Sequence, residues 1–287
     1  MNILLTGSKG FIGSSLARRL YKIKNITLFT DENAGDLSDL KNWENFKRVD
    51  LVIHLASKTN SLESNNKIKY YLENNLLSAI NGLEYCKKNN SKFIFISSYI
   101  YSKTAKLPVD ENSKIEPSNP YSLSKKLIED VCLFYKKNHK IKIIILRPSN
   151  VYGPDFNSKS FIMLLTKNMI NQKDIEIRNL NIKRDYIYID DLNEAIYKSI
   201  NYEGRNVIFN VGSGKSTSHS KLINILKKYK KYNLKIISPD EYINNNLSDS
   251  TLMDISLIKK EIKWKPRVDI NEGIESLIKY QENYYSN

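Results

Sequence analysis

The stretch ILLTGSKGFIGSSLARRL, residues 3–20, joins a short apolar run, three glycines and an amphipathic segment in direct succession. The apolar run predicts a buried β-strand over residues 3–6, and the amphipathic segment predicts a helix. Gly7, Gly10 and Gly13 lie at the junction, where the lack of Cβ atoms lets the backbone turn tightly and approach a pyrophosphate. That anion would lie at the positive N-terminus of the helix. The stretch therefore predicts a βα unit that binds a dinucleotide.

Apolar runs alternate with helical patterns along the first half of the chain. Further buried strands are expected at 26–30, 51–55, 93–97 and 143–147. Helices are expected at 11–21, 39–47, 63–88 and 121–137. This alternation predicts an α/β fold with a Rossmann-type, doubly wound parallel sheet and helices on both of its faces.

The pattern changes after Gly153, where longer helices, isolated strands and Asn-rich connections follow. We therefore expect a dinucleotide-binding domain over residues 1–152, to which parts of 185–211 return. A smaller C-terminal α/β domain, mainly over residues 153–287, is expected to bind the substrate.

Composition limits the classes of protein to consider. The chain has a net charge of +14, but its basic residues are spread along the sequence without a nucleic-acid-binding motif, so we expect no nucleic-acid partner. No apolar run approaches the ~20 residues that span a bilayer, and the N-terminus carries no export signal. We therefore expect a cytoplasmic protein with no membrane partner. Cys86 and Cys132 fall in helix-like stretches, so neither a disulfide framework nor a metal site is expected.

A second set of residues follows the strand at 93–97, which ends in SSYIY, residues 97–101. Downstream lies YSLSK, in which Tyr121 and Lys125 share a helix face. An ammonium beside a phenol favours the phenolate. Such a tyrosine can exchange a proton with a hydroxyl whose carbon exchanges hydride with a nicotinamide. A serine at the strand end can hold the same oxygen.

The choice between NAD and NADP rests on two charged residues with opposite effects. The second strand ends in Asp31, whose carboxylate can accept hydrogen bonds from ribose hydroxyls and would repel a 2′-phosphate. Lys9 lies within the glycine loop and would attract that phosphate. The bound dinucleotide is therefore expected to be NAD or NADP.

Taken in order, these motifs resemble those of the extended short-chain dehydrogenase/reductases, in the group of nucleotide-sugar epimerases, dehydratases and reductases. The resemblance covers nearly the whole chain. Its further landmarks are VIHLAS (52–57), NPYSLSK (119–125), LRPSNVYGP (146–154), RDYIYIDDL (184–192), NVGSG (210–214) and KWKPRVDINEGI (263–274). The resemblance implies a nucleotide-sugar substrate, bound NAD or NADP, and a homodimer formed through paired helices that include residues 121–137.

The resemblance also implies roles for individual residues. The pyrophosphate would be held by Gly7, Gly10, Phe11, Ile12 and Gly13. The adenine would lie at Asp36 and Leu37, and the dinucleotide would be lined by Leu55, Ala56 and Ser57. Tyr121 would be the general acid/base, Lys125 would grip the nicotinamide ribose, and the catalytic serine would be Ser97, with Ser98 as the alternative. The expected substrate-binding residues are Ser98, Tyr99, Asn150 and Arg184.

Residues 212–217, GSGKST, look like the end of a P-loop, whose backbone amides surround phosphates. The first glycine of that motif would fall at position 209, where this sequence has Phe209, whose side chain blocks the turn. The family pattern instead implies that Gly212 and Gly214 are turn glycines and that residues 215–217 begin a helix.

Three reactions of the family remain to be separated. Dehydratases resemble S-T-D-E in the serine motif, whereas this chain has SSYI, so dehydration is disfavoured. Only four residues separate Asp31 from Asp36, as in 4-keto-sugar reductases such as dTDP-4-dehydrorhamnose reductase and GDP-fucose synthase. The cysteine and histidine with which GDP-fucose synthase epimerises its substrate correspond here to Tyr99 and Phe161. A plain C4 reduction therefore fits better than a combined epimerase-reductase.

The main hypothesis is an NAD(P)H-dependent reduction of the C4 keto group of a nucleotide-activated deoxysugar or heptose, in the synthesis of surface-polysaccharide precursors. The alternative is an NAD-dependent nucleotide-sugar 4-epimerase. A lesser alternative is a non-catalytic dinucleotide-binding protein.

Overall fold

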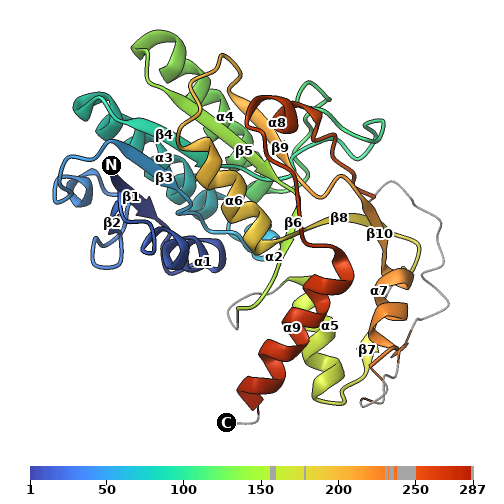
Figure 1. Cartoon of the computed structure of the whole chain (residues 1–287). Helices are drawn as coiled ribbons and strands as arrows, with labels where there is room; N and C mark the ends of the chain where they lie inside the picture. Colours follow the sequence, from blue (N-terminus) through green and yellow to red (C-terminus); the bar gives the residue numbers. More distant parts are fainter. Residues whose placement is uncertain (156–159, 178, 230–231, 233–235, 238–249, 286–287) are drawn as a thin grey trace. The chain divides into compact units, whose positions relative to one another are not determined.

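The computed structural model describes residues 1–155, 160–177, 179–229, 232, 236–237 and 250–285 (Figure 1). The chain divides into two compact units. Unit 1 comprises residues 1–102, 113–148 and 196–209, and unit 2 comprises 103–112, 149–195 and 210–287. Residues 103–112 thus belong to unit 2, although the sequence analysis places them in the dinucleotide-binding domain.

A six-stranded sheet has the order β2-β1-β3-β4-β5-β9. Its strands are β1 (Asn2–Thr6), β2 (Thr27–Thr30), β3 (Leu51–His54), β4 (Lys92–Ile96), β5 (Ile143–Pro148) and β9 (Ile208–Val211). The pairings from β2 through β1, β3 and β4 to β5 are parallel. The order reverses beside β1, and a parallel sheet binds its ligand at the carboxyl ends of the strands at such a point. The predicted α/β, Rossmann-type fold is confirmed.

The helices are α1 (Phe11–Leu20), α2 (Ser61–Ser64), α3 (Ile68–Asn89), α4 (Pro120–His139), α5 (Phe161–Ile170), α6 (Ile189–Ser199), α7 (His219–Leu226), α8 (Ser256–Glu261) and α9 (Ile270–Tyr285), with a 3-10 helix, η1 (Leu40–Trp43). The single helix predicted over 63–88 is therefore two, because Asn60 caps α2 and Asn65 and Asn66, which favour helices weakly, follow it. The predicted helix over 39–47 is reduced to η1. None of the described helices is long and apolar enough to span a membrane.

Helices α3 and α4 cover one face of this sheet, and the apolar core of unit 1 lies between them and β1, β3, β4 and β5 (Figure 1). Trp43 of η1 completes this core, and its indole Nε1 donates a hydrogen bond to the Leu37 carbonyl at 2.9 Å. Gly82 of α3 makes room for the indole, because a Cβ there would lie 2.8 Å from the ring. The packing of η1 against α3 thus depends on the large side chain of Trp43 and on the absence of a side chain at Gly82.

His54 of β3 is fully buried in the same layer. Its Nδ1 lies 2.8 Å from the Thr6 hydroxyl, and its Nε2 lies 3.2 Å from the Ser78 hydroxyl. Burial lowers the pKa of His54 to about 3. The imidazole is therefore neutral at physiological pH, and both of its nitrogens are satisfied within the core.

Unit 2 contains a three-stranded sheet of order β10-β8-β6, and a parallel pair of β11 and β7. The strands are β6 (Asn150–Tyr152), β7 (Ile175–Glu176), β8 (Lys183–Tyr188), β10 (Ser216–Ser218) and β11 (Ile236–Ile237). β8 pairs parallel to β6 and antiparallel to β10, so this sheet is mixed. Helix α9 packs against α5 (Figure 1).

We predict that Trp43→Ala lowers the free energy of unfolding by about 3–5 kcal/mol, the usual cost of truncating a buried aromatic side chain. Leu40→Ala on the same 3-10 helix is the matched control, because Leu40 is 52% exposed. Its truncation should change stability by less than about 0.5 kcal/mol. Urea unfolding followed by circular dichroism measures both variants. Equal losses would contradict the central place of Trp43 in this core.

Candidate active site

The glycine loop joins β1 directly to α1. Gly7 has φ +73°, in the left-handed region, and the Gly10 amide donates a hydrogen bond to the Gly7 carbonyl at 3.0 Å. A Cβ on Gly13 would lie only 2.0 Å from the same carbonyl oxygen. Gly7 and Gly13 are therefore required by the backbone itself. A Cβ on Gly10 would lie 3.2 Å from that oxygen, so the loop itself tolerates a side chain there far better.

A pocket of about 420 Å³ opens over this loop. Its lining residues come from the glycine loop, the start of α1, the segments that follow β2 and β3, and the start of α4. They are Gly7, Lys9, Gly10, Phe11, Ile12, Gly13, Asp31, Leu55, Ser57, Thr59 and Tyr121. Most of the predicted cofactor residues are thus brought together. Thr59 was missed by the sequence analysis, although its place just after VIHLAS was the available signal.

Four predicted cofactor residues do not line this pocket: Asp36, Leu37, Ala56 and Lys125, the last of which is described below with Tyr121. The backbone of Ala56 lies directly over Gly7, where a Cβ would come within 2.7 Å of the Ala56 nitrogen. Leu37 is buried, and its carbonyl accepts hydrogen bonds from Trp43 and from Asn81. The Asp36 carboxylate accepts hydrogen bonds from the amide and hydroxyl of Ser38. The adenine contacts of Asp36 and Leu37 therefore stay predictions.

Asp31 is bound to the glycine loop. Its Oδ2 accepts a hydrogen bond from the Gly7 amide at 2.7 Å, and its Oδ1 accepts bonds from the Ser8 amide at 3.1 Å and hydroxyl at 2.6 Å. The Lys9 ammonium donates to the Glu32 carbonyl at 3.0 Å. The glycine cradle and the carboxylate at the end of β2 together fit a dinucleotide, with negative charge where a ribose would lie.

Tyr121 lies in the first turn of α4. Asn119 begins this helix in a capping box, accepting a hydrogen bond from the Ser122 amide at 2.9 Å while its own amide donates to the Ser122 hydroxyl at 3.1 Å. Ser98 lies near the Tyr121 phenol and opposes the rise in the pKa of Tyr121 that burial causes. The capped helix start thus fixes the position of the phenol beside the segment that follows β4.

Lys125 lies one turn further along α4 and is buried. Its Nζ donates to the Ser57 hydroxyl at 2.8 Å and to the Ile96 carbonyl at 2.9 Å, and it lies 5.9 Å from the centre of the Tyr121 ring. Burial lowers the pKa of Lys125 to about 7, against the opposing charge of Glu129. Burial raises the pKa of Tyr121, and Ser98 opposes that rise. The phenol is therefore a proton donor at neutral pH, and it becomes a base only when a nearby positive charge stabilises the phenolate.

The two candidate serines have different partners. The Ser97 hydroxyl donates a hydrogen bond to Glu129 Oε1 at 2.5 Å inside the core, whereas Ser98 lies near the Tyr121 phenol. A buried carboxylate is a stronger hydrogen-bond acceptor than a phenol, which explains why the Ser97 hydroxyl donates to Glu129. Because the Ser97 hydroxyl already donates to Glu129, Ser98 is the serine left to act with Tyr121 in the proposal below, and the role of either serine stays a prediction.

The remaining predicted substrate residues divide between the two units. Tyr99 lies in unit 1 with its ring edge-on to Tyr101, at a centroid distance of 5.3 Å. Asn150 and Arg184 belong to unit 2, where Asn150 Nδ2 donates to the Asp185 carbonyl at 3.0 Å. Their roles toward the substrate stay predictions.

The stretch that looks like a P-loop surrounds a carboxylate of this chain. Asp185 is buried and accepts hydrogen bonds from the Ser213 amide at 2.7 Å and the Gly214 amide at 3.1 Å. A Cβ on Gly212 would lie 2.8 Å from Asp185 Oδ2. Residues 216–218 form β10, and Ser218 caps α7 by accepting from the Lys221 amide. The predicted helix start at 215–217 is therefore wrong, because these residues pair with β8.

Comparisons with known proteins show the family to which the chain belongs. A model of the NAD dependent epimerase/dehydratase family matches residues 3–212. A Methanocaldococcus jannaschii protein named putative UDP-glucose 4-epimerase is 32% identical over 98% of both chains. The Escherichia coli dTDP-4-dehydro-6-deoxyglucose reductase is 31% identical over 96% of both chains. The structure of a Bacillus cereus UDP-glucuronic acid 4-epimerase, in complex with UDP-glucuronic acid and NAD, is 26% identical, with a TM-score of 0.88 over 99% of this chain and 100% of its own.

We predict that Gly10→Ala and Gly13→Ala both weaken dinucleotide binding by at least about tenfold, or ~1.4 kcal/mol. Only Gly13→Ala should also lower the urea midpoint, because its Cβ meets backbone rather than ligand, an overpacking that costs about 1–3 kcal/mol. NADH fluorescence titration and urea unfolding separate the two effects. Wild-type affinity in Gly10→Ala would show that no pyrophosphate approaches this loop.

Proposed function

Because the chain belongs to the NAD dependent epimerase/dehydratase family, we propose that it is an NAD-dependent 4-epimerase of a nucleotide-activated sugar. In more general terms, the chain is an NAD(P)-dependent enzyme of the group that comprises nucleotide-sugar epimerases, dehydratases and reductases. One observation carries the proposal. Tyr121 lines the dinucleotide pocket, lies near Ser98, and has Lys125 one helical turn away.

When bound, NAD supplies a hydride acceptor that can return the hydride to the opposite face of C4. Residues of this chain transfer the proton of the C4 hydroxyl. Tyr121 takes it from the C4 hydroxyl and later returns it, while Ser98 holds the same oxygen by a hydrogen bond. The Lys125 ammonium supports the phenolate that forms between these two events.

NAD fits this site better than NADP. The Asp31 carboxylate is held against the Gly7 and Ser8 amides at the end of β2. A 2′-phosphate on the adenosine ribose would place negative charge beside it, and like charges at short range repel. The Lys9 ammonium, which could offset that repulsion, is bonded to the Glu32 carbonyl.

A 4-keto reductase, the main hypothesis of the sequence analysis, is the second candidate. Within the described residues, no strand lies between β2 and η1, which agrees with the short path from Asp31 to Asp36 that suggested a reductase. The E. coli relative at 31% identity is also a reductase. Epimerases predominate among the relatives, however, and they support the 4-epimerase better.

We predict that the purified protein retains NAD and interconverts UDP-glucose or UDP-glucuronic acid with its C4 epimer, without net consumption of added NADH. Tyr121→Phe should lower kcat by about 10²–10⁴-fold, since it removes the proton-transfer group while leaving the pocket filled. Ser98→Ala should lower kcat more than Ser97→Ala does. Product analysis by chromatography and released-cofactor assays measure these outcomes.

Stoichiometric oxidation of added NADH or NADPH by a 4-keto nucleotide sugar would replace the epimerase with the reductase. A bound dinucleotide without turnover of any hydroxy or keto sugar, together with an inert Tyr121→Phe substitution, would indicate the non-catalytic binding protein instead.

A homodimer is the second part of the proposal. Helices α3 and α4 pack together in unit 1, and both expose large apolar side chains: Tyr70 and Leu77 on α3, and Leu123, Leu133 and Phe134 on α4. Exposed apolar side chains that gather into a patch mark protein–protein contacts. A second copy of the chain would cover them through the same pair of helices, which gives a closed two-fold contact.

We predict that Phe134→Glu converts the dimer to a monomer, because it replaces the most exposed of these apolar side chains with a charge. Tyr21→Glu is the control, since Tyr21 is equally exposed but follows α1. Light scattering after size-exclusion chromatography gives the masses. A wild-type monomer, or a Phe134→Glu dimer, would remove this interface from consideration.

A further inference from the structure

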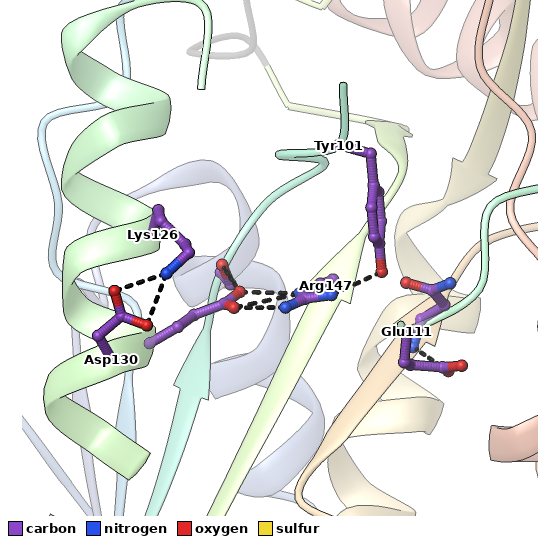
Figure 2. A network of polar contacts seen from close by, with 8 residues as sticks. Tyr101, Glu111, Lys126, Asp130 and Arg147 are labelled. Atoms are coloured by element: carbon purple, nitrogen blue, oxygen red, sulfur yellow. Dashed lines mark hydrogen bonds and ion pairs between the residues drawn. The ribbon is translucent and has the colours of Figure 1, made fainter. Parts of the chain in front are cut away.

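Beneath the predicted catalytic residues, one buried ion pair joins α4 to β5. Arg147 and Glu129 are 1% and 2% exposed, and Arg147 Nη2 lies 2.6 Å from Glu129 Oε2. Arg147 Nε also donates to both carboxylate oxygens, at 3.0 and 3.2 Å. Figure 2 shows this contact beside an exposed pair on the same helix, Lys126 with Asp130. Removing two charges from water is costly, so such a pair needs a reason beyond stability.

The pair also holds the segment that carries the serines. Ser97 donates to Glu129 Oε1 at 2.5 Å, and Arg147 Nη1 donates to the Tyr101 hydroxyl at 2.8 Å (Figure 2). Both ends of SSYIY are therefore fixed to one buried charge pair. Ser98 lies between these two anchored residues, and it influences the pKa of Tyr121.

The carboxylate of Glu129 is shared by two cations. Lys125 lies four residues earlier on α4, so the two side chains occupy one helix face. The Glu129 charge raises the pKa of Lys125 and opposes the effect of burial. The other titratable groups around Lys125 are Tyr121, Cys132 and His54, and burial keeps each of them uncharged at neutral pH. Glu129 is thus the anion that favours the ammonium form.

We propose that Glu129 and Arg147 are positioning residues: together they fix both ends of residues 97–101, which carry Ser98, and Glu129 places its carboxylate on the helix face that carries Lys125. The expected effect of these residues on turnover rests on the proposed function. Their expected effect on the titration of Lys125 rests on the structure alone. Neither residue touches the dinucleotide pocket. Substitution should therefore change kcat and its pH dependence, while the affinity for the dinucleotide changes little.

The test compares Glu129→Gln with Asp130→Asn, which removes the same charge from the adjacent residue of α4. In Glu129→Gln, the alkaline limb of kcat and the titration of Lys125 should both move to lower pH, by about one unit. Asp130→Asn should leave both unchanged, because Asp130 is exposed and pairs only with Lys126 among the contacts described. NMR of ¹³Cε-labelled lysine, assigned with Lys125→Met, follows the titration without substrate.

Glu129→Gln leaves Arg147 buried with a weaker partner and can lower stability. The double variant Glu129→Gln/Arg147→Met removes both charges, a change that buried ion pairs often tolerate. We expect it to fold and bind NADH as the wild type does, but to show the lowered Lys125 titration and a loss of kcat of at least about tenfold. A folded double variant with the wild-type titration and kcat would overturn the proposal. An inactive wild type with a shifted Lys125 titration in Glu129→Gln would instead refute the proposed epimerase and leave the role of Glu129 standing.

Discussion

The burial of Lys125 is the constraint on which the arrangement of unit 1 depends. An ammonium in the core loses its hydration, and this loss must be offset by oxygen atoms fixed in place. The Ser57 hydroxyl, the Ile96 carbonyl and, at longer range, the Glu129 carboxylate meet this need. Each comes from a different part of the unit, so the ends of β3 and β4 and the inner face of α4 are set in position by one side chain. Burial still lowers the pKa of Lys125 to about 7, against the opposing charge of Glu129, so its charge responds to small changes around it.

The spacing of residues along the chain was enough to predict those parts of the site that residues close together in sequence form. The strand–glycine–helix unit, the five parallel strands and the pairing of Tyr121 with Lys125 all depend on residues close in sequence. The bond that occupies the Ser97 hydroxyl does not, because its acceptor, Glu129, and the partner of that acceptor, Arg147, lie far along the chain and meet Ser97 only in the fold. No spacing rule connects these two residues to SSYIY.

The error at residues 215–217 has a different cause. Glycines 212 and 214 correctly indicated a turn, but the length of extended chain after that turn is set by pairing with β8. The turn itself resembles a phosphate loop for a physical reason, since its amides do surround an anion. The anion is the Asp185 carboxylate, which the fold supplies from β8. A sequence pattern can thus report the chemistry of a backbone correctly and still misidentify the partner.

The bonds between Asp31 and the glycine loop bear on how this enzyme could change its coenzyme. Three hydrogen bonds from Gly7 and Ser8 end on one carboxylate, and the loop is thereby preorganised before any ligand arrives. Replacing Asp31 with an apolar residue would remove the repulsion toward a 2′-phosphate, yet it would also leave loop donors without their acceptor, at about 1–3 kcal/mol for each one that stays buried. The Asp31 side chain therefore influences both which coenzyme is favoured and how well the glycine loop is ordered. A lineage or a designer moving from NAD to NADP would need to supply a new acceptor for these amides together with the new cation.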